Sequence, residues 1–249
     1  MTVLMYSITT AVKNFLFPGG AGCPLCGRRG SPKHLCRSCL EIWAGLARGF
    51  TPCEKCGRFS ADLGGSLICK ECQTGEQPFI KACSVAPYEG SVREALHYFK
   101  FCGKQDLAYP LGELLAALAA EVFPFKSFAA VVPVPLHEGR LRERGFNQAA
   151  LLADVIGRLL KIPLAEDALV RKMETPSQTS LSKQQRQANL KGVFESGNSA
   201  DGLQGKSVLL VDDVFTTGAT VQECSLVLKA SGVQKVYVAV VAAGILRVQ

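Results

Sequence analysis

The sequence predicts an α/β protein in which a parallel β-sheet is flanked by helices, preceded by a small cysteine-rich module. From about residue 80 onward, buried strand patterns alternate with amphipathic helix patterns, as in parallel sheets that are covered on both faces. Before residue 73, eight of the 11 cysteines form four C-x-x-C pairs. The composition is that of a globular protein, 48% hydrophobic and 20% charged over 249 residues, which excludes a disordered chain.

The chain divides into three predicted parts. Residues 1–22 repeat apolar side chains at helical spacing and predict an N-terminal helix, residues 23–79 carry the cysteine pairs, and residues 80–249 form the α/β domain. The start of the chain lacks the basic segment and cleavage site of a signal peptide. No apolar run in the sequence reaches the ~18–20 residues of a spanning helix. We therefore expect a cytoplasmic protein without a membrane span.

The paired cysteines are typical of zinc knuckles. They are Cys23, Cys26, Cys36, Cys39, Cys53, Cys56, Cys69 and Cys72. One C-x-x-C turn places two thiolates on an ion, and two turns make a tetrahedral Cys₄ site of the structural kind. Clustered pairs without a secretory signal favour metal binding over disulfides. Sequential pairing of the turns, the simplest arrangement, predicts two structural zinc sites, and spacing alone leaves an interleaved pairing open.

The formal net charge of +7 is weak evidence for nucleic-acid binding. Eight zinc-bound thiolates and two Zn²⁺ ions would lower the net charge to about +3. Basic residues that suit phosphate contact flank the knuckles, namely Arg28, Arg29, Lys33, Arg37, Lys55 and Arg58. The alternative is that these charges only balance the thiolates.

The first half of the α/β domain contains four predicted elements. Residues 82–88 form a short strand, and residues 92–101 have helical spacing that ends near a glycine. Residues 107–122 form a strongly amphipathic helix. Residues 128–134 are a buried strand, which prolines close.

The second half continues the alternation. Residues 148–160 form a helix, and residues 208–211 a fully apolar strand. Residues 221–230 form a helix that ends near a glycine, and residues 236–242 the last apolar strand. Ligands of such sheets bind at the carboxyl ends of the strands, which directs attention to the residues that follow Val134 and Val211.

The strand at 208–211 leads into a segment that suits a ribose 5-phosphate. Its residues are Asp212, Asp213, Thr216, Thr217, Gly218, Ala219 and Thr220. Backbone N–H groups at a helix start, with threonine hydroxyls, make a phosphate cradle, and Gly218 lets the backbone approach closely. Two adjacent carboxylates can accept hydrogen bonds from vicinal sugar hydroxyls. A plain capped helix needs one such residue rather than two acids and three threonines.

A second segment suits a diphosphate. A strand end is followed by an expected exposed loop, and three arginines then precede a helix start. The residues are Val134, Pro135, Leu136, Arg140, Arg142 and Arg144. Guanidinium groups match the geometry of phosphate oxygens. The alternative is a solvated basic helix entry.

Together these segments resemble a known family. Residues 208–220 resemble the phosphoribosyl-pyrophosphate (PRPP) motif of type I phosphoribosyltransferases. The R-x-x-x-R-G-F-N-Q string, with the N-terminal C-x-x-C pairs, is similar to the ComF family of bacterial competence proteins. The resemblance implies a type I phosphoribosyltransferase-like fold that binds PRPP with Mg²⁺.

The resemblance also implies roles for the site residues. Asp212 and Asp213 would be catalytic and contact the ribose hydroxyls, residues 216–220 would hold the 5′-phosphate, and residues 134–144 the pyrophosphate. Residues 96–101 resemble an early helix that carries a lysine. Residues 171–194 would form a mobile hood that closes over a ligand, with Arg186 reaching the pyrophosphate.

Two classes of function stay open. In the first, the protein is a PRPP-dependent transferase that acts on an unidentified acceptor. In the second, the fold is retained as a non-catalytic module that binds phosphate, single-stranded DNA or a partner protein during DNA uptake. The zinc module could recognise the acceptor or partner, or it could only stabilise the domain. The sequence identifies neither the acceptor nor the oligomeric state.

Overall fold

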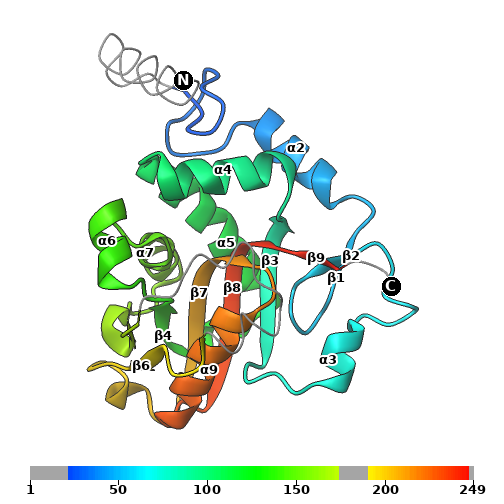
Figure 1. Ribbon diagram of the computed structural model, residues 1–249. Helices are drawn as coiled ribbons and strands as arrows, with labels where there is room; N and C mark the ends of the chain where they lie inside the picture. The colour runs from blue at the N-terminus through cyan, green and yellow to red at the C-terminus, as the bar shows by residue number, and fades with distance from the viewer. Residues whose placement is uncertain (1–21, 174–189, 247–249) are drawn as a thin grey trace.

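The computed structural model describes residues 22–173 and 190–246, and a four-stranded parallel sheet forms its centre (Figure 1). The strands lie in the order β3 (Lys81–Pro87), β8 (Lys235–Ala243), β7 (Ser207–Phe215) and β4 (Phe128–Pro133), and every neighbouring pair is parallel. The two central strands are apolar along most of their length because both of their faces are covered. The expected N-terminal helix lies outside the described residues.

Helices cover both faces of the sheet (Figure 1). Helices α5 (Ala108–Val122) and α7 (Gln148–Leu160) pack together on one face, and α9 (Ala219–Ala230) packs on the other. One hydrophobic core lies on each face of the sheet. Successive residues of β7 point into opposite cores, so Leu209 lies in the core on the α5–α7 side and Leu210 in the core on the α9 side. The predicted α/β class, with a parallel sheet flanked by helices, is confirmed.

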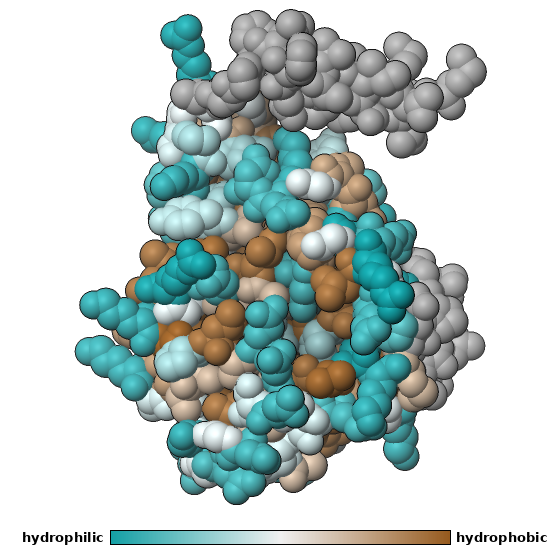
Figure 2. Space-filling view, turned by 90° about the vertical axis from the view of Figure 1, so that its left-hand side faces the viewer, coloured by the Kyte–Doolittle hydropathy of each residue, from teal (hydrophilic) through white to brown (hydrophobic). Residues whose placement is uncertain are grey.

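The remaining elements are short. They are α2 (Arg37–Ala47), β1 (Thr51–Pro52), β2 (Phe59–Ser60), α3 (Lys70–Thr74), α4 (Gly90–Phe101), α6 (Glu138–Arg144), β5 (Leu169–Arg171), β6 (Phe194–Ser196) and β9 (Ile245–Leu246), with single 3₁₀ turns at Gln105–Leu107, Phe125–Ser127, Glu166–Ala168 and Asp201–Leu203. Figure 2 shows the side of the molecule on which α6 and α7 lie, where apolar side chains are scattered among hydrophilic ones. Among the described residues, no helix combines the length and apolarity that a membrane crossing requires.

Two boundaries differ from expectation. The strand predicted to end at residue 211 continues as β7 to Phe215, because Asp212 and Phe215 keep their pairing with β8. The three arginines, expected to precede a helix start, themselves lie in a helix of their own, α6. His137 caps its start by accepting a hydrogen bond at Nδ1 from the N–H of Gly139 (3.2 Å), and Gly145 ends it with a φ of 79°.

The second half of the cysteine module is joined to the end of the central sheet. Strand β2 pairs in parallel with β9, which follows β8 directly, so the red end of the chain in Figure 1 reaches across to the cyan module. The N–H of Ala82 on β3 also donates to the carbonyl of Lys55 (2.9 Å), and the hydroxyl of Ser84 donates to the carbonyl of Gly57 (2.5 Å). These bonds hold the module against the edge strand β3.

Candidate functional site

A hollow of about 410 Å³ opens at the carboxyl ends of the parallel strands. Its lining residues are Tyr88, Lys100, Val134, Pro135, Leu136, Arg140, Arg144, Asn147, Gln148, Ala149, Arg171, Asp212, Asp213, Val214, Thr216 and Thr220. The strand-end rule for parallel sheets therefore locates the hollow correctly. It brings together residues of both segments that the sequence analysis singles out.

The end of β4 is tied to the start of α7 by one side chain. The Asn147 amide nitrogen donates to the carbonyl of Val134 (3.1 Å), and its oxygen accepts from the N–H of Ala149 (3.0 Å). Asn147 is thus both the N-cap of α7 and a brace for the strand end. This explains how Val134, Pro135 and Leu136 are held at the wall of the hollow.

The two acids meet different surroundings. Asp213 is buried, and its Oδ2 lies 2.6 Å from Nζ of Lys100 on α4. Asp212 accepts a hydrogen bond at Oδ1 from the N–H of Asp213 (2.8 Å). Burial, reinforced by the charge of Asp213, raises the pKa of Asp212 to about 8. Burial opposes the charge of Lys100, but Asp213 and Asp212 outweigh it and raise the pKa of that amine.

Cations outnumber acids around the hollow. Lys100, Arg140, Arg144 and Arg171 line it together with Asp212 and Asp213. Burial lowers the pKa of Arg144, although a guanidinium stays charged in any ordinary pH range. Since Asp212 also holds its proton near neutral pH, the hollow is electropositive and suits a ligand with several negative charges.

The Gln148 side chain brings to the wall of the hollow a hydrogen-bond donor that is unpaired within the described part of the chain. Its side chain is buried, and its Oε1 accepts from Nη1 of Arg144 (2.6 Å). Its Nε2 has no hydrogen-bond partner among the residues that the structure describes. Buried donors are nearly always paired. Because Gln148 lines the hollow, the wall of the hollow includes this unpaired buried donor.

The threonine-glycine loop leads from β7 into α9. Thr216 and Thr220 line the hollow, and Gly218 precedes the first turn of α9 with a φ of 83°. A Cβ on Gly218 would lie 2.4 Å from the ring of Phe215. Only glycine fits there, because a side chain would strain the backbone at this φ and would collide with the ring. The backbone N–H groups of the first turn of α9 are left for a ligand to use.

Some predicted site residues lie elsewhere. Arg142 is exposed on α6, where it pairs with Glu138 (2.9 Å), and it does not line the hollow. Thr217, Gly218 and Ala219 belong to the loop and the start of α9 but are not among the lining residues. Arg186, with most of the predicted hood, lies outside the described residues.

The hollow also contains residues that the sequence analysis did not assign to the site. Tyr88 lines it directly after strand β3, so the strand-end rule could have found it. The sequence indicates Lys100 only as a lysine on a helix, because its pairing with Asp213 depends on the tertiary structure. Arg171 ends β5, outside the main parallel sheet.

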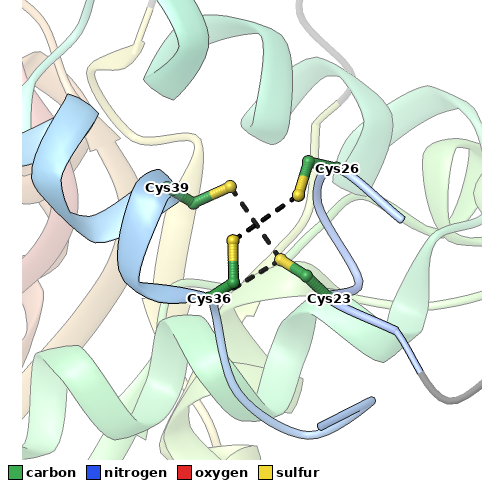
Figure 3. A group of neighbouring side chains, drawn as sticks. All are labelled: Cys23, Cys26, Cys36 and Cys39. Atoms are coloured by element: carbon green, nitrogen blue, oxygen red, sulfur yellow. Dashed lines mark hydrogen bonds between the residues drawn. The ribbon is translucent and has the colours of Figure 1, made fainter. Parts of the chain in front are cut away.

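The cysteines gather in two separate clusters, as sequential pairing predicts. The first cluster is Cys23, Cys26, Cys36 and Cys39, and the second cluster is Cys53, Cys56, Cys69 and Cys72, with all sulfurs of a cluster within 4.8 Å of one another. In the first, the side chains converge from a loop and from the start of α2 (Figure 3).

The sulfur spacing of both clusters fits zinc. The Sγ atoms of Cys23 and Cys39 are 3.9 Å apart, and those of Cys26 and Cys36 are 3.6 Å apart. In the second cluster, Cys56 and Cys69 are 3.9 Å apart. Four thiolates at the Zn–S bond length of about 2.3 Å form a tetrahedron with edges of about 3.8 Å. Each cluster can therefore hold one Zn²⁺ ion.

Arg58 corrects one expectation for the cysteine module. Its place beside the knuckles predicts a basic residue that suits phosphate contact, but its side chain is buried. Its Nε donates to Sγ of Cys56 (3.4 Å) and its Nη2 to the carboxylate of Glu71 (2.6 Å). Burial opposes its charge, but these partners outweigh burial and raise its pKa. It balances thiolate charge and is not available to a nucleic acid.

Comparison with known proteins agrees with this arrangement. Residues 144–247 match the model of the phosphoribosyl transferase domain family. Competence protein F of Haemophilus influenzae is 32% identical over 215 residues, which is 82% of this chain and 93% of the relative. Competence protein ComFC of Bacillus subtilis is 30% identical, covering 80% of this chain and 67% of the relative. DNA utilization protein YhgH of Escherichia coli is 31% identical, covering 76% of this chain and 82% of the relative.

Two solved structures show a limited likeness to this chain. A glutamine PRPP amidotransferase from B. subtilis overlaps 51% of this chain with a TM-score of 0.35 and 21% identity, and the chain covers 24% of that protein. A purine phosphoribosyltransferase from Pyrococcus horikoshii overlaps 56% of this chain and is itself covered over 90% of its length, with a TM-score of 0.30 and 17% identity.

Proposed function

Because the chain belongs to the ComF family, we propose that it binds PRPP with Mg²⁺ in the hollow and transfers the phosphoribosyl group to an acceptor, in a process linked to DNA uptake. The family carries a phosphoribosyltransferase-like domain, which this chain has over residues 144–247. The relatives are named for competence and for DNA utilization.

One observation carries the proposal. Asp212 and Asp213 share a hollow with Lys100, Arg140 and Arg144, beside the start of helix α9. Vicinal hydroxyls need acceptors, a diphosphate needs cations, and a 5′-phosphate suits a helix start. PRPP presents these three groups together.

We assign roles by matching each group of PRPP to the nearest suitable side chains. Asp212 and Asp213 accept hydrogen bonds from the ribose hydroxyls, and residues 216–220 hold the 5′-phosphate. The backbone of residues 134–136, with Arg140 and Arg144, faces the pyrophosphate. Mg²⁺ enters with PRPP and shields the charge of the departing diphosphate.

The chain's own contribution would be electrostatic. Positive charge develops on the ribose as pyrophosphate leaves, and the Asp213 carboxylate lies at the ribose position that the proposal assigns. Arg140 and Arg144 would stabilise the leaving group, and Gln148 would donate Nε2 to one of its oxygens. Groups fixed in place before the reaction stabilise such charges without reorganisation.

The zinc assignment belongs to the same proposal. Each Cys₄ cluster would hold one structural Zn²⁺ ion, so that residues 23–79 form a double zinc ribbon ahead of the transferase-like domain at 80–249. Eight thiolates committed to metal suit a reducing compartment, and on this ground we propose a cytoplasmic location.

A second function is favoured by one surface feature. The Phe101 side chain, 63% exposed, lies at the end of α4, and the guanidinium carbon of Arg144 lies 5.0 Å from its ring centroid. Exposed aromatic rings beside cations are typical of single-stranded DNA contacts. In this alternative the hollow holds a phosphate of the DNA backbone, and no transfer takes place.

Calorimetric titration with PRPP and Mg²⁺ tests the proposal. The zinc-loaded protein is compared with the Asp212→Asn/Asp213→Asn double variant. Micromolar binding that the double variant loses, while it stays folded and keeps its zinc content, supports the PRPP site. A folded wild-type protein that does not bind PRPP overturns it. Binding of single-stranded DNA that Phe101→Ala weakens would then favour the alternative.

A further inference from the structure

We propose that Arg58 is a positioning residue that couples the second cysteine cluster to the phosphate loop at residues 216–220. Metal binding by that cluster would thereby set the shape of the loop. The inference rests on the proposed function only for the identity of the ligand that the loop binds.

At one end, Arg58 is fixed by the second cluster. Its exposed fraction is 6%, and its guanidinium reaches Sγ of Cys56 (3.4 Å), Sγ of Cys69 (3.9 Å) and Glu71 (2.6 Å). Four thiolates around one Zn²⁺ ion carry a net charge of about −2. The buried cation therefore offsets part of the cluster's charge, and the cluster fixes where the cation lies.

At the other end, Arg58 faces the residue beneath the loop. Its guanidinium carbon lies 6.0 Å from the ring centroid of Phe215, and Phe79 meets the same ring edge-on at 6.2 Å. Phe215 is almost fully buried. Because a Cβ on Gly218 would lie 2.4 Å from this ring, the loop backbone rests directly on it. A displacement of the ring would therefore move Gly218.

Backbone hydrogen bonds reinforce this connection. The N–H of Phe59, the residue after Arg58, donates to the carbonyl of Gly244 (3.2 Å), and the N–H of Gly244 donates to the carbonyl of Phe215 (2.8 Å). A Cβ on Gly244 would lie 3.3 Å from the carbonyl oxygen of Thr216. The module thus reaches the loop through a side-chain contact and through the backbone.

The first cluster contacts a different part of the domain. His34 pairs with Glu113 on α5 (2.7 Å), and Lys104 donates to the carbonyl of Pro24 (3.3 Å). These contacts lie with α4 and α5 rather than with the phosphate loop. The two clusters therefore have different predicted effects, and only the second is coupled to residues 216–220.

The experiment measures the loop and its ligand separately in the full-length, zinc-loaded protein. Arg58→Met, Arg58→Lys and Phe215→Leu are compared with wild type, and Arg48→Met on the exposed end of α2 is the control. Zinc content is counted, the amide resonance of Gly218 is recorded by ¹⁵N NMR, and the Kd for PRPP with Mg²⁺ is measured. The resonance reports the loop without any ligand.

We expect Arg58→Met to shift the Gly218 amide resonance and to raise the Kd at least fivefold, with partial recovery in Arg58→Lys. Arg48→Met should match wild type. Where Arg58→Met loses zinc or fails to fold, Arg58→Lys decides, because it keeps the buried positive charge and removes the guanidinium that faces the ring. Phe215→Leu, which removes the ring beside Gly218, calibrates how large a shift the ring itself produces. An unshifted Gly218 resonance in folded Arg58→Met, or in Arg58→Lys where that variant decides, overturns the coupling. Failure of wild type to bind PRPP overturns the proposed function instead, and the resonance still tests the coupling.

Discussion

The amine of Lys100 lies 2.6 Å from a carboxylate oxygen of Asp213, and this ion pair joins the end of α4 to the end of the central strand β7. The Lys100 side chain is 22% exposed and that of Asp213 is 9% exposed. The pair gives Asp213 a cationic partner, whereas the neighbouring Asp212 has a pKa raised to about 8. Two adjacent acids therefore have different electrostatic surroundings.

We expect Lys100→Met to lower the free energy of unfolding by about 3 kcal/mol, because it leaves the buried Asp213 carboxylate without its cation. Urea denaturation measures the change. Lys126→Met, at an exposed position, should change stability by less than about 0.5 kcal/mol. The double variant Lys100→Met/Asp213→Asn should regain part of the loss. A single variant as stable as wild type would show that the ion pair contributes nothing.

We expect Gly218→Ala to destabilise the protein by about 2 kcal/mol and to weaken PRPP binding, because a methyl group would combine the strain of a φ of 83° with a clash against Phe215. Gly205→Ala is the matched control, since its φ is 69° but no atom lies within 4 Å of an added Cβ. Thermal unfolding and calorimetry measure both variants. Equal losses in the two would assign the effect to backbone strain alone.

The raised pKa of Asp212 predicts how stability depends on pH. The folded chain binds this proton more tightly than the unfolded chain does, since the ordinary value is 3.8 and the folded value is about 8. The contribution of this group to the free energy of unfolding is therefore complete below about pH 4. It is lost as the pH rises toward 8, by up to about 1.4 kcal/mol per pH unit. Urea denaturation measures the free energy of unfolding at about pH 5 and pH 8, and Asp212→Asn should reduce the difference between the two values. Parallel pH profiles in wild type and variant would contradict the assignment.

Much of the fold could be predicted because periodicity reports burial. Each of the eight elements expected between residues 82 and 242 is present, and α7 has the expected bounds. The extension of β7 to Phe215 was not predicted, since pairing with β8 keeps the acids in the strand. That pairing is tertiary and leaves no signal in the local pattern.

Part of the site could be predicted, because the sequence pattern shows where strands end and helices begin. Asp212, Asp213 and Arg144 lie at such positions, where ligands of parallel sheets bind. Arg58 could not be placed, because a basic residue in a cysteine-rich segment resembles a surface charge. Its burial depends on Glu71 and on Phe215, which is distant in sequence.

Zinc counting tests the cluster assignment. We expect two Zn²⁺ ions per chain, because each set of four sulfurs has the spacing of a tetrahedral site. Cys26→Ser and Cys72→Ser should each lower the count to about one, and Cys102→Ser, at an exposed cysteine outside both clusters, should leave it unchanged. Native mass spectrometry and metal analysis measure the count. A count of one in wild type would mean that one cluster does not bind zinc.

The arginines of α6 provide the sharpest test of the pyrophosphate assignment. The sequence groups Arg140, Arg142 and Arg144 together, but only Arg140 and Arg144 line the hollow. Arg144→Ala removes a charge beside Asp213 and leaves the Gln148 oxygen without its donor, so we expect the Kd for PRPP with Mg²⁺ to rise about tenfold or more. Arg142→Ala breaks an exposed pair with Glu138 and should change the Kd by no more than about twofold.

Calorimetry with PRPP, and separately with inorganic pyrophosphate, distinguishes the two arginines. The loss in Arg144→Ala should appear with both ligands, because the proposed contact is with the diphosphate rather than with the ribose. A loss with PRPP alone would move Arg144 to the sugar. Equal losses in Arg142→Ala and Arg144→Ala would mean that α6 turns when the ligand binds, so that the charge of the whole helix, rather than the pair of arginines at the wall, attracts the diphosphate.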